Sequence, residues 1–181
     1  VKYLDLDDNH IIDQNDVQQI GKSWVPELVY TLGARFDFKG FDFSFLFQGF
    51  GGVSYNLLDN AAMMKPLMNN ANVFKTAKEA WVYYPDQNLD NRATAKYPRL
   101  TLEGNDNNYR TSSMWIVDAD YLRLRNIELG YTYKENVRVF VSGQNLLTIS
   151  GLLREYNLDP ESPNGYYPAV KSVIVGLNLS F

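Results

Sequence analysis

The chain has 181 residues, a formal net charge of −4, no cysteine and one histidine. Disulfide frameworks, thiolate nucleophiles and cysteine-ligated zinc are therefore excluded, and the acidic balance without a basic stripe argues against a nucleic-acid partner. No stretch approaches the apolar length of a transmembrane helix, whereas the alternating strands of a membrane barrel keep mean hydropathy low and are compatible with this composition.

Residues 5–16, DLDDNHIIDQND, follow the ligand spacing of an EF-hand-like calcium loop. Side-chain oxygens fall at positions 1, 3, 5, 9 and 12, and a main-chain carbonyl would supply position 7. His10 stands where such loops use glycine for its positive φ, and the last ligand is an aspartate instead of glutamate, as in dockerin loops. We expect a structural calcium ion here, with a solvated acidic turn as the alternative. The expected ligands are Asp5, Asp7, Asn9, Ile11, Asp13 and Asp16.

Residues 27–38 alternate between apolar and polar side chains over an unusually long stretch, which predicts a β-strand with one apolar face. Lys39 and Gly40 then form a two-residue hairpin turn. The returning strand carries four phenylalanines on one side, and such a face needs a large apolar partner. These are Phe41, Phe43, Phe45 and Phe47.

Residues 53–113 lose the alternation and form a connection of roughly sixty residues, far above the usual length and therefore functional or structured in its own right. Within it, residues 72–81 predict a short helix with Asn72 as its N-cap. Four aromatic residues in or beside the connection are candidates to stack on sugar rings or contact a peptide. The alternative is that they pack the connection onto itself or onto a partner protein. They are Trp81, Tyr83, Tyr84 and Trp115.

Residues 115–133 predict a third strand whose apolar phase changes part of the way along. Leu122 and Leu124 share one parity and Ile127 and Leu129 the other, so a β-bulge is expected near residues 125–126. A fourth strand at 137–147 follows a short turn. A second long connection at 150–169 leads to a terminal strand at 170–181 that ends in an aromatic residue.

Asp118 and Asp120 suggest a hydrolase, because paired carboxylates can act as acid and base. On one strand they would share a face about 7 Å apart, a spacing compatible with that chemistry. No cleft accompanies them, however, so the sequence predicts that the chain is not an enzyme.

The connections between the five strands alternate between short and long, which is the asymmetry of outer-membrane barrels. Aromatic residues flank both short turns, as in an interfacial girdle. Five strands cannot close a bacterial barrel, so the chain is expected to be part of a larger one. The polar strand faces would line the lumen and form ion pairs that face a plug. The alternative is a calcium-stabilised soluble β-sandwich that binds carbohydrate. The charged lumen residues are Arg123, Arg125, Glu128 and Arg138.

Several stretches, in order along nearly the whole chain, carry a family likeness. The chain resembles the C-terminal part of SusC/RagA-family TonB-dependent transporters, the nutrient importers of Bacteroidetes outer membranes. The matching stretches are KYLDLDDNHIIDQNDVQQIG (2–21), ELVYTLGARFDFKGFDFSFLFQG (27–49), KYPRL (96–100), SSMWIVDADYLRLRNIELGY (112–131) and VFVSGQNLLTIS (139–150).

The resemblance implies an all-β fold in which this chain supplies about five C-terminal strands of a large antiparallel transmembrane β-barrel, with about 22 strands in the whole barrel. It implies long extracellular loops, a short loop helix, and a location in the outer membrane of a Gram-negative bacterium. Residues 1–26 would form an extracellular loop with the EF-hand/dockerin-like segment, and residues 27–181 the barrel strands with their loops.

The resemblance also implies partners and one further role. A SusD-like surface lipoprotein would close the outside, and TonB would act through an N-terminal region and plug that lie in the remainder of the transporter. The cargo would be an oligosaccharide or a peptide. Phe181 resembles the C-terminal aromatic residue by which the outer-membrane assembly machinery recognises its clients.

Overall fold

The computed structural model describes residues 1–68, 71–164 and 167–181. These residues form two compact units: a loop unit, residues 1–21 and 56–117, and a sheet unit, residues 22–55 and 118–181. The chain passes from one unit to the other three times: after Gly21, within the short strand β3 (Ser54–Asn56) and within the short strand β6 (Ile116–Asp118). The boundary predicted from the sequence, between residues 26 and 27, stays a prediction.

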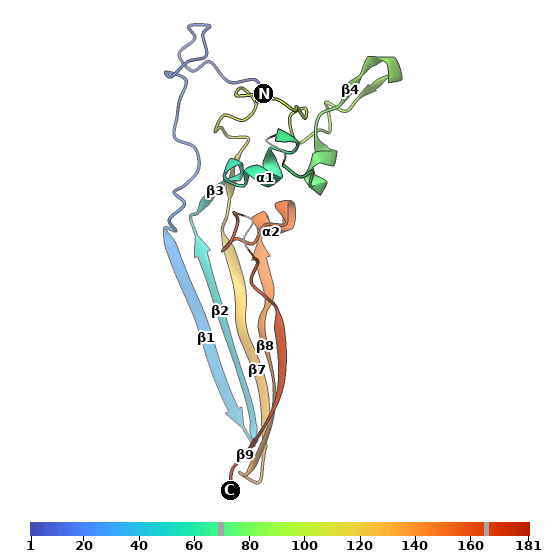
Figure 1. Ribbon diagram of the computed structural model, residues 1–181. Helices are drawn as coiled ribbons and strands as arrows, with labels where there is room; N and C mark the ends of the chain where they lie inside the picture. Colours follow the sequence, from blue (N-terminus) through green and yellow to red (C-terminus); the bar gives the residue numbers. More distant parts are fainter. Residues whose placement is uncertain (69–70, 165–166) are drawn as a thin grey trace. The chain divides into compact units, whose positions relative to one another are not determined.

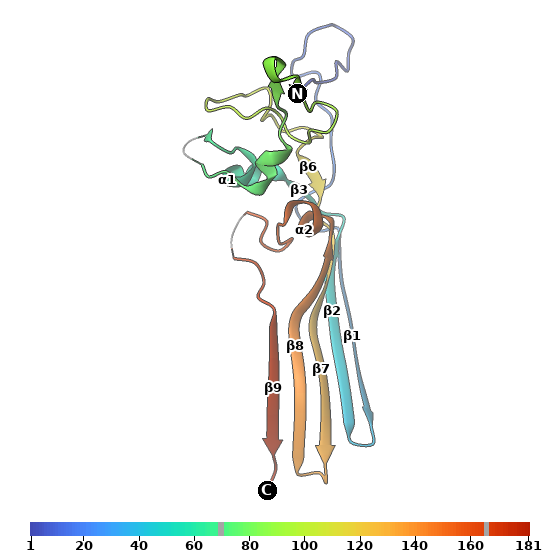
Figure 2. The ribbon, with the colours of Figure 1, turned by 90° about the vertical axis from the view of Figure 1, so that its right-hand side faces the viewer.

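The sheet unit is one antiparallel sheet of five strands in the order β1-β2-β7-β8-β9 (Figures 1 and 2). The all-β antiparallel fold predicted from the alternation is thereby confirmed. The strand bounds are β1 Leu28–Phe38, β2 Phe41–Gly51, β7 Tyr121–Tyr133, β8 Val137–Ser150 and β9 Ser172–Leu179.

Registered pairs show that the two faces of the sheet differ in chemistry. Neighbouring strands align apolar side chains with apolar ones along a row on one face, which we call the apolar face. That row is Phe36, Phe43, Leu129, Val141 and Val175. The row beside it, on the polar face, is Arg35, Ser44, Glu128, Ser142 and Ile174.

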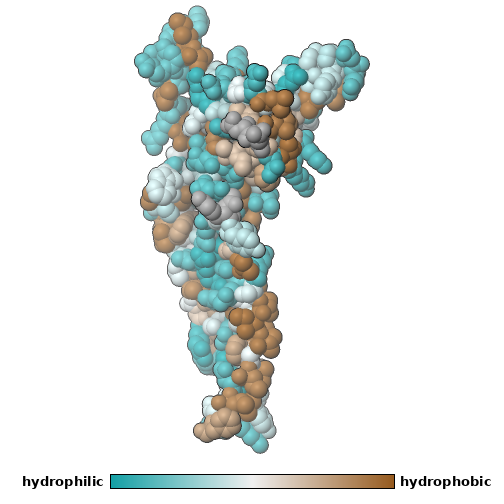
Figure 3. Space-filling model, viewed as in Figure 1, coloured by the Kyte–Doolittle hydropathy of each residue, from teal (hydrophilic) through white to brown (hydrophobic). Residues whose placement is uncertain are grey.

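The apolar face is open to its surroundings. Val175 is 75% exposed and Leu32 is 65% exposed, and most other large apolar side chains of β1 and β9 are exposed too. Figure 3 shows hydrophobic side chains gathered over β9 and toward the C-terminal end of the sheet, with hydrophilic side chains beside them. An apolar sheet face of this size needs an apolar medium or partner.

Both hairpins of the sheet turn tightly, and they do so at the same end. Lys39 and Gly40 have φ values of 48° and 85°, and Lys134 and Glu135 have 46° and 64°. Positive φ at both central residues gives a turn whose twist matches that of the flanking strands. The two turns and the C terminus lie at one end of the sheet, and α2 (Gly151–Tyr156) lies at the other (Figure 2).

The β-bulge predicted from the phase change is present in β7. Phe47 pairs with Leu124 and Leu46 pairs with Asn126, so Arg125 is the extra residue. The register of β7 with β8 shifts at the same place. The prediction of a bulge near residues 125–126 is therefore confirmed.

Two local expectations were wrong, and one element was not predicted. The helix predicted at residues 72–81 is a shorter 3₁₀ helix, η3 (Lys75–Glu79), which begins after Phe74 and has no side-chain cap. The third strand does not run unbroken from Trp115, because β6 ends at Asp118 and β7 begins at Tyr121. The connection after β8 contains α2, a helix that the sequence pattern did not show.

The loop unit has a small core of its own. Trp115 is fully buried and stacks against Tyr97 and Tyr109, with ring centroids 6.2 and 5.9 Å away. Leu57 and Met64 are also buried. The unit's short elements are η1 (Leu57–Asp59), α1 (Ala61–Met64), η3, η4 (Pro85–Gln87) and the hairpin of β4 (Tyr83–Tyr84) with β5 (Leu89–Asp90).

None of the helices in the described ranges is long and apolar enough to cross a membrane. The described strands also offer no second sheet of long strands that covers the apolar face of the first. The sandwich that the sequence left open as an alternative would require such a covering sheet.

Candidate functional site

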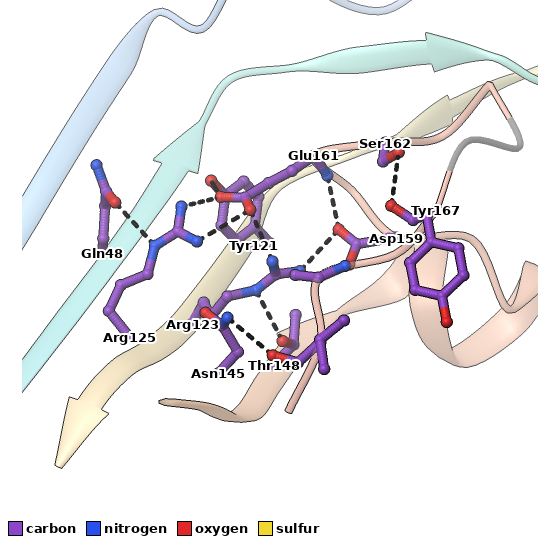
Figure 4. A network of polar contacts seen from close by, with 12 residues as sticks. Gln48, Tyr121, Arg123, Arg125, Asn145, Thr148, Asp159, Glu161, Ser162 and Tyr167 are labelled. Atoms are coloured by element: carbon purple, nitrogen blue, oxygen red, sulfur yellow. Dashed lines mark hydrogen bonds and ion pairs between the residues drawn. The ribbon is translucent and has the colours of Figure 1, made fainter. Parts of the chain in front are cut away.

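A network of polar contacts in the sheet unit lies on the polar face, toward the end of β7 that follows the long connection (Figure 4). Side chains two residues apart on a strand share a face. Arg123 and Arg125, two residues apart, therefore lie next to one another on this face. Opposite them lie Asp159 and Glu161, which come from the connection between β8 and β9 (Figure 4).

Arg123 is 1% exposed and uses all three nitrogens of its guanidinium group. Its Nε donates to Thr148 Oγ1 at 3.0 Å, its Nη2 to Asp159 Oδ1 at 2.7 Å and its Nη1 to Glu161 Oε2 at 2.6 Å. A planar guanidinium suits such a fixed fork of acceptors. The buried charge of Arg123 is thus compensated within the unit.

Arg125 completes the cluster at its more open side. Its Nε donates to Gln48 Oε1 at 2.9 Å, and its two terminal nitrogens contact the carboxylate of Glu161. The hydroxyl of Tyr121 donates to the same carboxylate. Two arginines therefore face two carboxylates, so the cluster as a whole is neutral.

The electrostatics of Asp159 fit a fixed ionic partner. Burial by itself raises the pKa of this carboxyl, but the main-chain N–H groups of Glu161 and Ala169 and the guanidinium of Arg123 together hold the pKa below its usual value. Asp159 is 8% exposed and accepts these bonds at 2.7 to 3.0 Å. The aspartate is thus kept ionised where it is buried.

A second cluster occupies the polar face near the short turns. Arg138 donates to Asp42 and to Glu128, and its Nε lies 2.9 Å from Asp42 Oδ2. Arg35 and Asp37 on β1 form a neighbouring exposed pair, 2.9 Å apart. The four charged residues predicted to line the lumen therefore all find ion-pair partners inside this chain.

The sequence did not single out Asp159 and Glu161. They stand in the irregular stretch LDPESPN, and their arginine partners lie 36 and 38 residues earlier. The available signal was two arginines on a polar strand face whose strand carries one carboxylate, Glu128, which pairs with Arg138 instead. Such a pair requires acidic partners from elsewhere in the chain.

In the loop unit, the acidic segment brings three of its predicted ligands together. Carboxylate oxygens of Asp5, Asp7 and Asp16 lie within 4.8 Å of one another. Asp16 accepts from the main-chain N–H of Leu6 at 2.6 Å and of Asp13 at 2.8 Å, and these bonds, Leu6 first, lower its pKa.

The conformation of the segment fits a cation loop in two further respects. His10 has a φ of 65°, the left-handed conformation for which EF-hand loops use glycine. Asp5 Oδ1 is a buried oxygen without a hydrogen-bond partner among the described residues. A hard cation would satisfy this oxygen together with its neighbours. Asn9 Oδ1 and Asp13 Oδ1 instead accept main-chain N–H groups at 2.7 Å.

The four candidate aromatic residues differ in what they contact. Trp115 is fully buried and its Nε1 donates to the carbonyl of Asn108 at 3.0 Å, so it packs the loop unit onto itself. Trp81 stacks with Tyr83 at 6.3 Å and donates to Asp90 Oδ1 at 3.0 Å. Tyr83 and Tyr84 are 43% and 51% exposed on the β4–β5 hairpin.

The remaining predicted site residues lie elsewhere. Phe181 is fully exposed beyond the end of β9. Asp118 and Asp120 sit at the break between β6 and β7, where Asp120 accepts from the N–H of Val53 at 2.9 Å and Asp118 accepts from the N–H of Asp120 at 2.7 Å. Both carboxylates therefore hold main chain in place.

An antiparallel sheet that exposes apolar side chains on one face and buries arginine–carboxylate clusters on the other has the pattern of a transmembrane barrel wall. Comparisons of sequence agree with this class. The chain is 28% identical to TonB-dependent receptor P26 of Formosa agariphila, over 99% of this chain and 19% of that protein. It is also 28% identical to TonB-dependent receptor SusC of Bacteroides thetaiotaomicron, over 99% of this chain and 17% of that protein.

The chain spans about a fifth of the length of the curated relatives it matches. No protein-family model matches it. Among solved structures, it superposes on the RagAB peptide transporter with a TM-score of 0.62 and 24% identity, over 94% of this chain and 19% of that one. The RagAB peptide importer in its closed-closed state gives the same TM-score at 22% identity.

The fold is therefore similar to that of a part of the RagAB structures. The resemblance to the C-terminal part of SusC/RagA-family TonB-dependent outer-membrane transporters, drawn from the sequence, is confirmed.

Proposed function

We propose that this chain is part of the wall and outer loops of a TonB-dependent importer in the outer membrane of a Gram-negative bacterium. The observation that carries the proposal is the inverted sheet, with Val175 and Leu32 exposed and Arg123 buried. Lipid on one side and a polar lumen on the other account for both. The chain has a transport role and no catalytic one, which agrees with relatives that are receptors and transporters.

The importer would take up oligosaccharides or peptides, with energy supplied by TonB through the remainder of the transporter and with a SusD-like lipoprotein on the outside. The similarity to a peptide importer supports peptides as the cargo in this proposal. Exposed aromatic and apolar side chains of the loop unit support a partner that covers them. They include Val73, Phe74, Tyr83, Tyr84 and Leu89.

The sidedness of this proposal can be tested on intact cells that carry the complete transporter. Single cysteines replace Asp86, in the loop unit, and Ser180, beside the C terminus; both positions are exposed. A membrane-impermeant maleimide should label Asp86→Cys from outside and leave Ser180→Cys unlabelled until the cells are opened. Labelling of Ser180→Cys from outside would refute the proposed orientation.

We further propose that residues 5–16 hold a structural calcium ion. The convergence of Asp5, Asp7 and Asp16 and the unpaired Asp5 Oδ1 support it. Asp13, Asn9 and the Ile11 carbonyl would complete the oxygen set predicted from the spacing. The ion would fix the conformation of the loop, because nothing nearby supplies a nucleophile.

Calcium should protect residues 1–21 of the complete transporter from limited proteolysis, and a chelator should remove that protection. Asp5→Asn should abolish the calcium effect, since it removes one of the three converging carboxylates. Asp8→Asn is the matched control, because Asp8 lies in the same segment outside the three-carboxylate group. Equal protection with and without calcium would leave the solvated acidic turn as the correct account.

A further inference from the structure

The connection between β8 and β9 folds back onto the sheet within the sheet unit. Helix α2 begins directly after β8, ends at Tyr156 and is capped by Asn157, whose φ of 57° is left-handed. The N–H of Asn157 donates to Leu153 O at 3.0 Å. Leu152 and Leu158, on either side of this reversal, are 0% and 7% exposed. The change of direction is therefore fixed by packing and by a helix cap.

The residues after this reversal, 157–164, are held on the polar face at several points; we call them the strap. Asp159 and Glu161 meet Arg123 and Arg125 (Figure 4). Removal of one member of a buried pair leaves an uncompensated charge, which is strongly unfavourable. Any placement of the strap that separates these four charges would leave a charge without its partner, so the observed placement is favoured.

The strap is also braced internally and at its far end. Asp159 Oδ1 accepts from the N–H of Glu161 at 2.9 Å, and the N–H of Ser162 donates to Asp159 O at 2.9 Å. Tyr55 is 8% exposed, and its hydroxyl donates to Asn164 Oδ1 at 2.7 Å. Contacts of this kind suit a rigid element more than a freely moving loop.

We propose that the strap is a fixed lining of the polar face, on the lumen side of the barrel near its outer mouth. Its ion pairs with Arg123 and Arg125 hold it there, and we call these ion pairs the latch. Arg123 and Arg125 share the polar face because they are two residues apart on β7, and the β-bulge at residues 125–126 changes the phase so that Glu128 falls on the same face. That the polar face is the lumen side rests on the proposed barrel function. The attachment of the strap to this face does not depend on that function.

Hydrogen exchange in the complete, detergent-purified transporter tests the latch. Peptides covering residues 157–164 should be protected in the native protein. Arg123→Met should speed their exchange by about 100-fold, the scale expected when one partner of a buried ion pair is lost. Arg123→Lys, which keeps the charge, should restore part of the protection. Arg35→Gln is the matched control, since Arg35 is an ion-paired arginine of the same face that does not touch the strap.

The milder variants Arg125→Gln and Asp159→Asn cover the case in which Arg123→Met fails to fold. Faster exchange confined to the strap supports the latch. Strap exchange that is already fast in the native protein, or unchanged in all three variants, overturns it.

Cysteine labelling on intact cells tests the lumen-side placement separately. With a bulky impermeant maleimide, Ser162→Cys should react at least about fivefold more slowly than Asp86→Cys, because a latched strap is shielded by the wall. Adding Arg123→Met should bring the two rates together. Equal rates in the native background would overturn the placement on the lumen side, even where the labelling of Asp86 and Ser180 upholds the barrel orientation.

Discussion

The loop unit and the sheet unit distribute their side chains in opposite ways. In the loop unit the buried side chains are mostly apolar, with Trp115 at the centre and Leu57 beside it. In the sheet unit Arg123, Asp42 and Asp159 are buried, while β1 and β9 expose apolar side chains. The same physical rule explains both, because each side chain is placed for the medium that surrounds its unit. Among the described residues, the apolar side chains buried in the sheet unit lie at or beyond the α2 end of the long strands, as Leu152 and Leu158 do, while most exposed apolar side chains of this unit lie along the strands themselves.

The two units also differ in the interactions that stabilise them. The sheet is held by hydrogen-bond ladders between long strands, which are interrupted only at the bulge of β7, and its charged clusters fix side chains on one face. The loop unit has only short elements and depends on a few aromatic contacts. A single substitution in the aromatic core should therefore affect the loop unit while the sheet stays intact.

Trp115→Ala should have the largest effect of any single substitution proposed for this chain, and it should act on the loop unit alone. It removes a fully buried indole that stacks on two tyrosines, at a cost of about 3–5 kcal/mol. Limited proteolysis of the complete transporter should then cut within residues 56–117. Trp24→Ala, at a site 82% exposed, is the control. Equal resistance of the two variants would show that Trp115 does not organise this unit.

Phe43→Arg should have the next largest effect on stability. It tests whether the apolar face of the sheet is the one that meets lipid. A charge on the lipid face costs about 2–4 kcal/mol near the middle of a bilayer. Ser44→Arg is the matched control, because it places the same side chain on the polar face one residue away. Urea unfolding of the transporter in lipid vesicles should separate the two variants. If both lose the same stability, the face assigned to lipid is wrong.

Gly176→Ala should have an intermediate effect, on the polar face between β8 and β9. A Cβ at Gly176 would come within 2.2 Å of the Phe140 ring, which lies over this glycine. Displacing the ring should cost about 1–3 kcal/mol. Adding Phe140→Ala should make the glycine substitution nearly neutral, whereas Gly151→Ala, in open space, should change little from the start. An unchanged penalty in the Phe140→Ala background would refute this contact.

The strands and the bulge could be predicted because they leave a period of two in the sequence. The change of phase between Leu124 and Ile127 located the bulge within one residue of Arg125. When the two faces of a strand meet different media, apolar and polar residues must alternate along it, so the period is visible in the sequence. The points where the chain reverses could be predicted as well, because the two tight turns interrupt the alternation at Lys39-Gly40 and Lys134-Glu135.

The strap and the core of the loop unit left no comparable period. Whether Glu161 reaches Arg125 depends on the left-handed cap at Asn157, 32 residues beyond the arginine. The burial of Trp115 depends on Tyr97, which lies 18 residues before it in an irregular stretch. Contacts between distant segments of irregular backbone are decided by packing, and no local pattern records them.

Tyr30→Phe should have the smallest effect, and it refines the picture of the apolar face. Tyr30 is a polar group on that face: its ring crosses Gly49 of β2, and its hydroxyl donates to Tyr121 O on β7 at 2.8 Å. A hydroxyl in an apolar medium needs such an acceptor, and its loss should cost about 0.5–1.5 kcal/mol. Tyr133→Phe, at the rim beside the short turn and 53% exposed, should cost less. Unfolding in vesicles measures both. If the two substitutions cost the same, the hydrogen bond to Tyr121 does not stabilise the sheet, and the ring over Gly49 is what fixes Tyr30.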